Sequence, residues 1–175
     1  MKRIILITGG QRSGKSAYAE QLALSLDAHP IYMATAHIWD EEFRLRVIQH
    51  QRRRGGQWEN IEEERQLSKH CIYNKVCVID CLTLWYTNFF YGDGKNTAEE
   101  IDVQEVLSNL KDEFDRFTQQ EATFIFVTNE IGSGGVSDHL LQRKFTDLEG
   151  WMNQYVAQLA DEVILMVAGI PVKIK

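Results

Sequence analysis

A short glycine-rich segment near the N-terminus constrains this chain more than any other feature. It matches the pattern GxxxxGK[ST] and consists of Gly9, Gly10, Gln11, Arg12, Ser13, Gly14, Lys15 and Ser16. The apolar run over residues 2–8 predicts a buried strand before it, and residues 15–26 have the apolar periodicity of a helix. Because the pattern binds phosphate when it joins a strand to a helix, we predict a phosphate-binding loop.

Each part of this loop has a physical role in that prediction. Gly9 and Gly14 allow the backbone angles that point successive N–H groups at phosphate oxygens. The helix that begins here adds the positive end of its dipole. Lys15 can reach the β- and γ-phosphates of a nucleotide, and the Ser16 hydroxyl can ligate Mg²⁺. The segment therefore predicts a nucleoside triphosphate site with Mg²⁺ as cofactor.

Further apolar runs alternate with helical patterns along the chain. The runs that predict strands cover residues 30–34, 76–80, 123–128 and 161–167, with 172–174 as a hairpin partner after a turn at 169–171. Helical patterns cover residues 98–117, with Thr97 and Glu100 as a capping box, and residues 138–160, where Gly150 could break the helix. This alternation predicts an α/β fold, a P-loop NTPase-like three-layer domain with a mostly parallel sheet and a short C-terminal hairpin.

Length and charge exclude several other classes of protein. The 175 residues fit one domain, so we expect residues 1–175 to form a single nucleotide-binding domain. A formal net charge of −6 argues against nucleic acid as a partner, because the summed field repels phosphate. The longest apolar stretch, residues 163–172, is too short for membrane insertion. Three cysteines without a CxxC pair predict a reduced, cytoplasmic protein in which they serve as small buried hydrophobes.

A second acidic group for the metal is expected at the end of a neighbouring strand. Asp80 ends the apolar run over residues 76–79, which is the usual place for a Walker B aspartate that ligates Mg²⁺. The alternative is a polar residue that caps a helix beginning at Leu82. Thr128, Asn129 and Glu130 end another predicted strand, where they could orient substrate or water, or serve only as turn residues.

One predicted helix carries an unusual set of side chains. Residues 40–54 have a helical pattern with His50 on the apolar face, and the helix ends in Arg52, Arg53 and Arg54 before two glycines. A structural interpretation is a histidine in the core and arginines that complement the helix dipole. A functional one is a triphosphate that the arginines bind and deliver to a histidine nucleophile. From the residues alone both interpretations stay open.

Several blocks in order resemble a known family over nearly the whole chain. They are the segments at residues 8–16, 19–20, 32–35 and 46–50 with Arg54 and Trp58, then 80–85 with Asn88, 127–132, 153–154, 160–163 and 169–173. Together they are similar to the bifunctional adenosylcobinamide kinase / adenosylcobinamide-phosphate guanylyltransferases of cobalamin biosynthesis.

That resemblance implies a function and a set of residues. The family phosphorylates the aminopropanol hydroxyl of adenosylcobinamide with a nucleoside triphosphate, ATP or GTP, and then transfers GMP from GTP to adenosylcobinamide phosphate. The second reaction passes through a guanylyl-histidine, which falls on His50, and Lys15 is the other catalytic residue expected. Mg²⁺ ligands fall on Ser16 and Asp80, and a homotrimer is implied. Further nucleotide contacts fall on Ala34, Thr35, Ala36, Gln51, Arg52, Arg53, Arg54 and Glu62.

Two other functions explain part of the sequence. A different small P-loop kinase, acting on a metabolite or nucleoside hydroxyl, would account for the loop and Asp80 but not for the helix with His50. A nucleotide-sensing module that regulates a partner is the third alternative.

Overall fold

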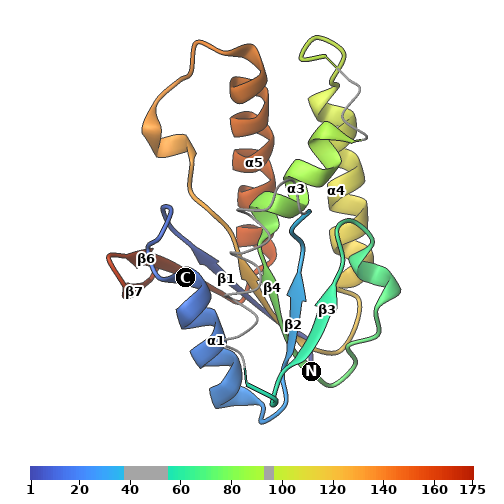
Figure 1. Ribbon diagram of the computed structural model, residues 1–175, viewed down its shortest axis with the longest axis vertical. Helices are drawn as coiled ribbons and strands as arrows, with labels where there is room; N and C mark the ends of the chain where they lie inside the picture. Colours follow the sequence, from blue (N-terminus) through green and yellow to red (C-terminus); the bar gives the residue numbers. More distant parts are fainter. Residues whose placement is uncertain (38–54, 93–96) are drawn as a thin grey trace.

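The computed structural model describes residues 1–37, 55–92 and 97–175, and its centre is a seven-stranded sheet in the order β3-β2-β4-β5-β1-β6-β7 (Figure 1). Every neighbouring pair is parallel except β6 and β7, which form an antiparallel C-terminal hairpin. The strands are β1 (Arg3–Thr8), β2 (Ile31–Ala34), β3 (Glu59–Glu62), β4 (Val76–Asp80), β5 (Thr123–Val127), β6 (Glu162–Val167) and β7 (Ile170–Lys173).

Helices cover both faces of the sheet, which makes three layers. One face packs against α1 (Lys15–Leu26), and the other packs against α3 (Leu82–Tyr91), α4 (Val103–Phe117) and α5 (Leu140–Leu159) (Figure 1). Two short 3₁₀ helices, η1 (Leu67–Lys69) and η2 (Gly132–Gly134), lie in connections. Because side chains alternate along a strand, Ile4 and Leu6 enter the core under α3–α5 while Ile5 and Ile7 enter the core under α1. The predicted α/β class and three-layer sheet are confirmed.

The sequence prediction missed one strand. β3 reads Glu-Asn-Ile-Glu and pairs in parallel with β2 at the edge of the sheet. Three of its four residues are exposed, so this edge strand lacks the apolar run that marks a strand buried on both faces. Its pairing with β2 is the only signal that it is a strand.

Two predictions about helices were wrong in detail. Thr97 and Glu100 do bond, with the Thr97 N–H and hydroxyl both donating to the Glu100 carboxylate, but they form a turn and α4 begins later, at Val103. Asp102 is the N-cap, and its carboxylate accepts from the N–H groups of residues 104 and 105. Lys144 donates to the carbonyls of residues 98 and 101 and so holds that segment outside the helix. The other correction concerns Gly150, where α5 continues without a break.

The cysteines and the turn of the hairpin need smaller corrections. Cys77 and Cys81 are buried thiols, as expected, but Cys71 is exposed. The hairpin turn consists of Ala168 and Gly169 alone, because residues 170 and 171 already pair in β7. No helix in the described ranges is long and apolar enough to cross a bilayer.

Candidate active site

The parallel strands bring the predicted site residues to one edge of the sheet. The register places Ala34 beside Glu62 on one side and beside Asp80 on the other, at the carboxyl ends of β3, β2 and β4. Asp80 in turn lies beside Val127 of β5, whose other neighbour is Ile7, just before the phosphate loop at residues 9–16. Ligands bind outside the carboxyl ends of strands in open α/β sheets, so this edge is where a nucleotide site belongs.

The phosphate loop has the backbone conformation that its glycines allow. Gly9 has φ +149°, Arg12 φ +57° and Gly14 φ +96°, and the last is the N-cap of α1. A Cβ added at Gly9 would lie 2.6 Å from the carbonyl oxygen of Met166, so the backbone would have to shift to admit a larger residue there. No side chain caps α1, so its first N–H groups are left for a ligand.

Lys15 lies inside this loop and is almost fully buried, with an exposed fraction of 7%. Its Nζ donates a 2.7 Å hydrogen bond to the carbonyl of Gly10. Burial lowers the pKa of Lys15, and the negative charges of Asp80 and Glu149 oppose that shift. The buried Ser13 hydroxyl has no hydrogen-bond partner among the described residues. A buried cation and an unpaired buried hydroxyl in one loop fit an anionic ligand that the loop would surround.

Asp80 does not cap the helix that follows it. The N-cap of α3 is Cys81, which makes no side-chain capping bond, and the Asp80 carboxylate instead accepts a 2.7 Å hydrogen bond from the Tyr32 hydroxyl. The capping alternative is therefore wrong. Among the described residues no three His, Cys, Asp or Glu side chains cluster as metal ligands. One carboxylate with one hydroxyl suits Mg²⁺, which keeps most of its ligands as water and substrate phosphates.

The segment after β2 is held rigidly beside Asp80. Thr35 is fully buried, and its hydroxyl donates to the Cys81 carbonyl at 2.7 Å, while its own carbonyl accepts from the Asn88 amide. Ala34 and Ala36 flank it and are half-buried. Glu62 is exposed at the end of β3. The structure thus brings Ala34, Thr35, Ala36 and Glu62 to the edge that carries Asp80.

Part of the predicted site lies outside the described residues. His50 and the cluster of Gln51, Arg52, Arg53 and Arg54 belong to the range 38–54, as does all of the predicted helix 40–54. Their predicted roles stay predictions.

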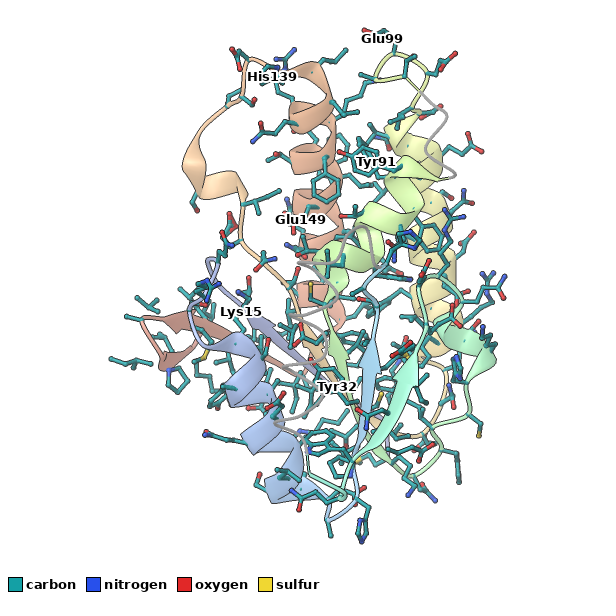
Figure 2. All side chains as sticks on the ribbon, viewed as in Figure 1. Lys15, Tyr32, Tyr91, Glu99, His139 and Glu149 are labelled. Carbon is teal, nitrogen blue, oxygen red and sulfur yellow. The ribbon has the colours of Figure 1, made fainter. Side chains whose placement is uncertain are left out.

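A buried polar network that the sequence analysis missed lies behind the loop. Glu149 of α5 (Figure 2) is 1% exposed. It accepts a 2.7 Å hydrogen bond from the Thr83 hydroxyl, which itself accepts from the Asn129 N–H at 2.9 Å. The Thr128 hydroxyl donates to the side chain of Asn153. Thr128 and Asn129 therefore belong to a packed network rather than to a simple turn. The signal in the sequence was a carboxylate on the apolar face of α5, between Leu148 and Met152.

Burial raises the pKa of Glu149 to about 7, because the carboxylate loses its hydration. The hydrogen bond from Thr83 and the positive charge of Lys15 oppose that shift, and the charge of Glu130 adds to it. One carboxylate oxygen of Glu149, Oε2, has no hydrogen-bond partner in the described part of the chain. A proton on that oxygen removes the cost of a buried charge, so Glu149 holds a proton up to neutral pH.

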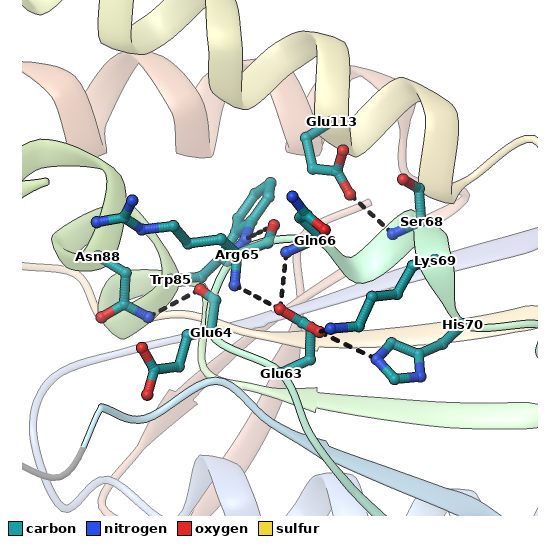
Figure 3. Close-up of polar contacts among 10 residues, drawn as sticks. All are labelled: Glu63, Glu64, Arg65, Gln66, Ser68, Lys69, His70, Trp85, Asn88 and Glu113. Carbon is teal, nitrogen blue, oxygen red and sulfur yellow. Dashed lines mark hydrogen bonds and ion pairs between the residues drawn. The ribbon is translucent and has the colours of Figure 1, made fainter.

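A second polar cluster fixes the chain just beyond β3 (Figure 3). The Glu63 carboxylate is 7% exposed and accepts from the N–H groups of Arg65 and Gln66, at 3.0 and 2.9 Å. It also forms ion pairs with Lys69 and His70. Burial by itself would raise the pKa of Glu63, but these hydrogen bonds outweigh it and lower the pKa to about 2. The Glu63 N–H donates to the Ala34 carbonyl, so the cluster anchors β3 beside β2.

Comparison with known proteins finds relatives that match nearly the whole chain. The bifunctional adenosylcobalamin biosynthesis protein CobU of Escherichia coli (strain K12) is 37% identical over 182 residues, covering 98% of this chain and 99% of that protein. The bifunctional adenosylcobalamin biosynthesis protein CobP of Pseudomonas aeruginosa is 34% identical over 176 residues, covering 97% and 96%. An ATPase from the type III secretion system of pathogenic bacteria superposes with a TM-score of 0.56 at 14% identity, over 94% of this chain and 52% of that one, which shows a shared fold.

A family model also matches nearly the whole sequence. It describes the cobinamide kinase / cobinamide phosphate guanyltransferase family and matches residues 5–174 of the 175. The relatives cover the same span at more than 30% identity. The match includes the phosphate loop, Asp80 and the network around Thr83. On these grounds the chain belongs to the cobinamide kinase / cobinamide phosphate guanyltransferase family.

Proposed function

We propose that this chain phosphorylates adenosylcobinamide with a nucleoside triphosphate and then transfers GMP from GTP to the resulting phosphate, giving adenosylcobinamide-GDP. The observation that carries the proposal is the family match over residues 5–174, joined to a phosphate loop that shares one sheet edge with Asp80. The specific substrate comes from the family resemblance. The phosphate chemistry is supported by the loop itself.

In the phosphorylation step, the substrate hydroxyl oxygen bonds to the γ-phosphorus and the bond from that phosphorus to the β-bridging oxygen breaks. The nucleoside diphosphate leaves with that oxygen, and the hydroxyl proton is released to water. The loop N–H groups and the uncapped start of α1 are suited to bind the β- and γ-phosphates. The Lys15 ammonium would leave the Gly10 carbonyl for phosphate oxygens, where it offsets the charge that develops on the leaving diphosphate. Ala34, Ala36 and Glu62 would contact the nucleotide from the adjoining strands, and the buried Thr35 would hold that segment in place.

Mg²⁺ fits the donors at this edge, and the Ser16 hydroxyl and the Asp80 carboxylate would hold it. When bound, it supplies positive charge to the phosphate oxygens. Tyr32 orients the carboxylate through its 2.7 Å hydrogen bond, so that one carboxylate oxygen is fixed in direction. Such outer contacts set the geometry of a metal ligand.

The transfer step would use His50 as the nucleophile. A neutral ring nitrogen attacks the α-phosphorus of GTP, a P–N bond forms, and the bond to the leaving pyrophosphate breaks. A phosphate oxygen of adenosylcobinamide phosphate then attacks the same phosphorus and the P–N bond breaks. Arg52, Arg53 and Arg54 would bind the triphosphate, since guanidinium groups pair with phosphate in a fork, and Gln51 would contact the nucleotide beside them.

The test is covalent labelling with GTP that carries the label on its α-phosphate. Wild-type protein incubated with Mg²⁺ and this GTP, then denatured, should keep a label that is labile to acid and stable to alkali. His50→Ala should lose that label while it still phosphorylates adenosylcobinamide. Full transfer activity in His50→Ala would refute the nucleophile, and a folded wild type that binds nucleotide but takes no label would favour another small P-loop kinase.

The remaining parts of the proposal rest on the resemblance and on composition. They are a homotrimer, a cytoplasmic location and a single nucleotide-binding domain over residues 1–175. Sedimentation of the purified chain at several concentrations tests the first.

A further inference from the structure

The turn of the C-terminal hairpin lies directly against the phosphate loop, although about 155 residues separate them in sequence. Figure 1 shows the β6–β7 hairpin beside the connection from β1 to α1. The N–H of Gly169 donates a 3.0 Å hydrogen bond to the carbonyl of Ser13, the residue before Gly14. A Cβ added at Gly14 would lie only 3.3 Å from the Cα of Gly169, so the two backbones are in close contact.

This contact decides which way one peptide of the loop faces. A trans peptide is planar, and its C=O and N–H point in opposite directions. Because the Ser13 carbonyl is turned outward to Gly169, the N–H of Gly14 in the same peptide is turned the other way, toward the inner side of the loop. That N–H is one of the donors a phosphate oxygen would need.

The opposite end of the loop is held in the same manner. The carbonyl of Gly9 accepts a 3.0 Å hydrogen bond from the N–H of Glu130, in the segment after β5. The loop therefore has an outward-facing carbonyl tied down at each end, to Glu130 on one side and to Gly169 on the other. Nothing in the loop itself supplies either contact.

The hairpin turn is shaped for this contact. Ala168 and Gly169 have φ of +51° and +84°, as the mirror-image turns of two-residue hairpins require. A Cβ added at Gly169 would meet nothing within 4 Å. Glycine is therefore needed here for its backbone angle, since there is room for a side chain.

We propose that Gly169 is a positioning residue for the phosphate loop, whose N–H fixes the Ser13–Gly14 peptide so that Gly14 can donate to a bound phosphate. The inference rests on the proposed nucleotide-binding function of the loop. It adds a residue of the C-terminal hairpin to the determinants of nucleotide affinity.

The sharpest test replaces the Gly169 N–H by an oxygen. A synthetic peptide of residues 168–175, with Ala168→Cys for ligation, is joined to residues 1–167. Two full-length proteins are made in this way. In one, an ester replaces the amide between residues 168 and 169, and in the other that amide is kept. The amide form is the matched control. We expect the ester to raise the Kd for ATP with Mg²⁺, and for pyrophosphate, by about fivefold or more, because one hydrogen bond that orients a donor is lost.

A second variant separates the backbone angle from the hydrogen bond. Asparagine tolerates positive φ and keeps its N–H, so Gly169→Asn should bind ATP nearly as tightly as wild type. The KM for the nucleotide should rise in the ester form more than kcat falls, because the loop is mispositioned while the reacting groups are intact.

The outcomes distinguish this inference from the proposed function. Equal Kd values for the ester and amide forms, even with a lower Tm for the ester, would overturn the positioning role and leave a purely structural contact. If the wild-type chain bound neither ATP nor pyrophosphate, the proposed function of the loop would fall and this inference with it.

Discussion

The Thr83 hydroxyl donates a 2.7 Å hydrogen bond to Oε1 of Glu149, and both side chains are buried behind the phosphate loop. Thr83 lies in the first turn of α3, the helix after Asp80, whereas Glu149 lies in the middle of α5. The contact therefore joins the helix that follows the predicted metal ligand to a helix from the last third of the chain. Its most direct consequence is for the dependence of stability on pH.

The wild type should lose stability as the pH rises toward 7, and Glu149→Gln should not show this loss. The pKa of Glu149 is about 7 in the folded state against 4.5 in the unfolded state, so the folded state holds a proton that the unfolded state has lost. The stability that this proton contributes is present below pH 4.5 and is lost as pH rises to about 7, for a total of roughly 3 kcal/mol.

Urea unfolding at pH 5 and pH 8 measures this difference. The exposed carboxylate of Glu99 provides the control, since Glu99→Gln makes the same chemical change at a solvent-exposed site. The unfolding free energy of Glu149→Gln minus that of the wild type should be higher at pH 8 than at pH 5. The same pH dependence in Glu149→Gln and wild type would show that Glu149 does not hold its proton.

Glu63→Gln should have the opposite pH profile. The pKa of Glu63 is about 2 in the folded state against 4.5 in the unfolded state, so its carboxylate stabilises the fold above pH 4.5 and this contribution is lost as pH falls toward 2. We expect the variant to lose about 2–3 kcal/mol at pH 7 and almost nothing near pH 2. Lys69→Met serves as the control and should cost less than about 1 kcal/mol, because the lysine is mostly exposed. A pH-independent loss in Glu63→Gln would instead indicate a packing defect.

Gly9→Ala and Gly10→Ala should differ sharply in stability. Alanine at Gly9 would need φ +149° and would place its Cβ 2.6 Å from the Met166 carbonyl, so β6 or the loop must move. A cost of about 2–4 kcal/mol follows from strain and a steric clash with backbone. At Gly10 an added Cβ meets nothing within 4 Å. Thermal unfolding of the two variants without nucleotide is the measurement, and equal Tm values would contradict the geometry of the loop.

Lys15→Met should weaken nucleotide binding without unfolding the protein. The methionine fills nearly the same volume, and within the described ranges Nζ would lose one hydrogen bond, to the Gly10 carbonyl. Loss of a charge-assisted contact to phosphate should raise the Kd for ATP by about 10- to 100-fold. Titration calorimetry measures it, with the unfolding transition as the check on folding. An unchanged Kd would place the phosphates elsewhere.

Much of the fold could be read from local patterns. The helix predicted over residues 15–26 coincides with α1, and the strand runs agree with β1, β2, β4, β5 and β6 to within one residue at either end. These segments are buried on both faces or have one apolar face, so their sequence reports directly on their structure. The phosphate loop was predictable for the same reason, because its chemistry depends on consecutive residues.

The rest depended on contacts between distant segments. The strand β3 is polar and exists through its pairing with β2, and α4 begins at Val103 because Lys144 and Asp102 satisfy the groups before it. Nothing near Asp80 in sequence indicates that Tyr32 orients it.

The sequence by itself therefore determined the α/β class, the phosphate loop and the family. The tertiary structure decided that Glu149 is a buried carboxyl with a raised pKa, and that Gly169 faces Ser13. The physical reason is that a backbone motif is built from neighbouring residues, whereas burial, protonation and the direction of a peptide depend on what packs against it from elsewhere in the chain.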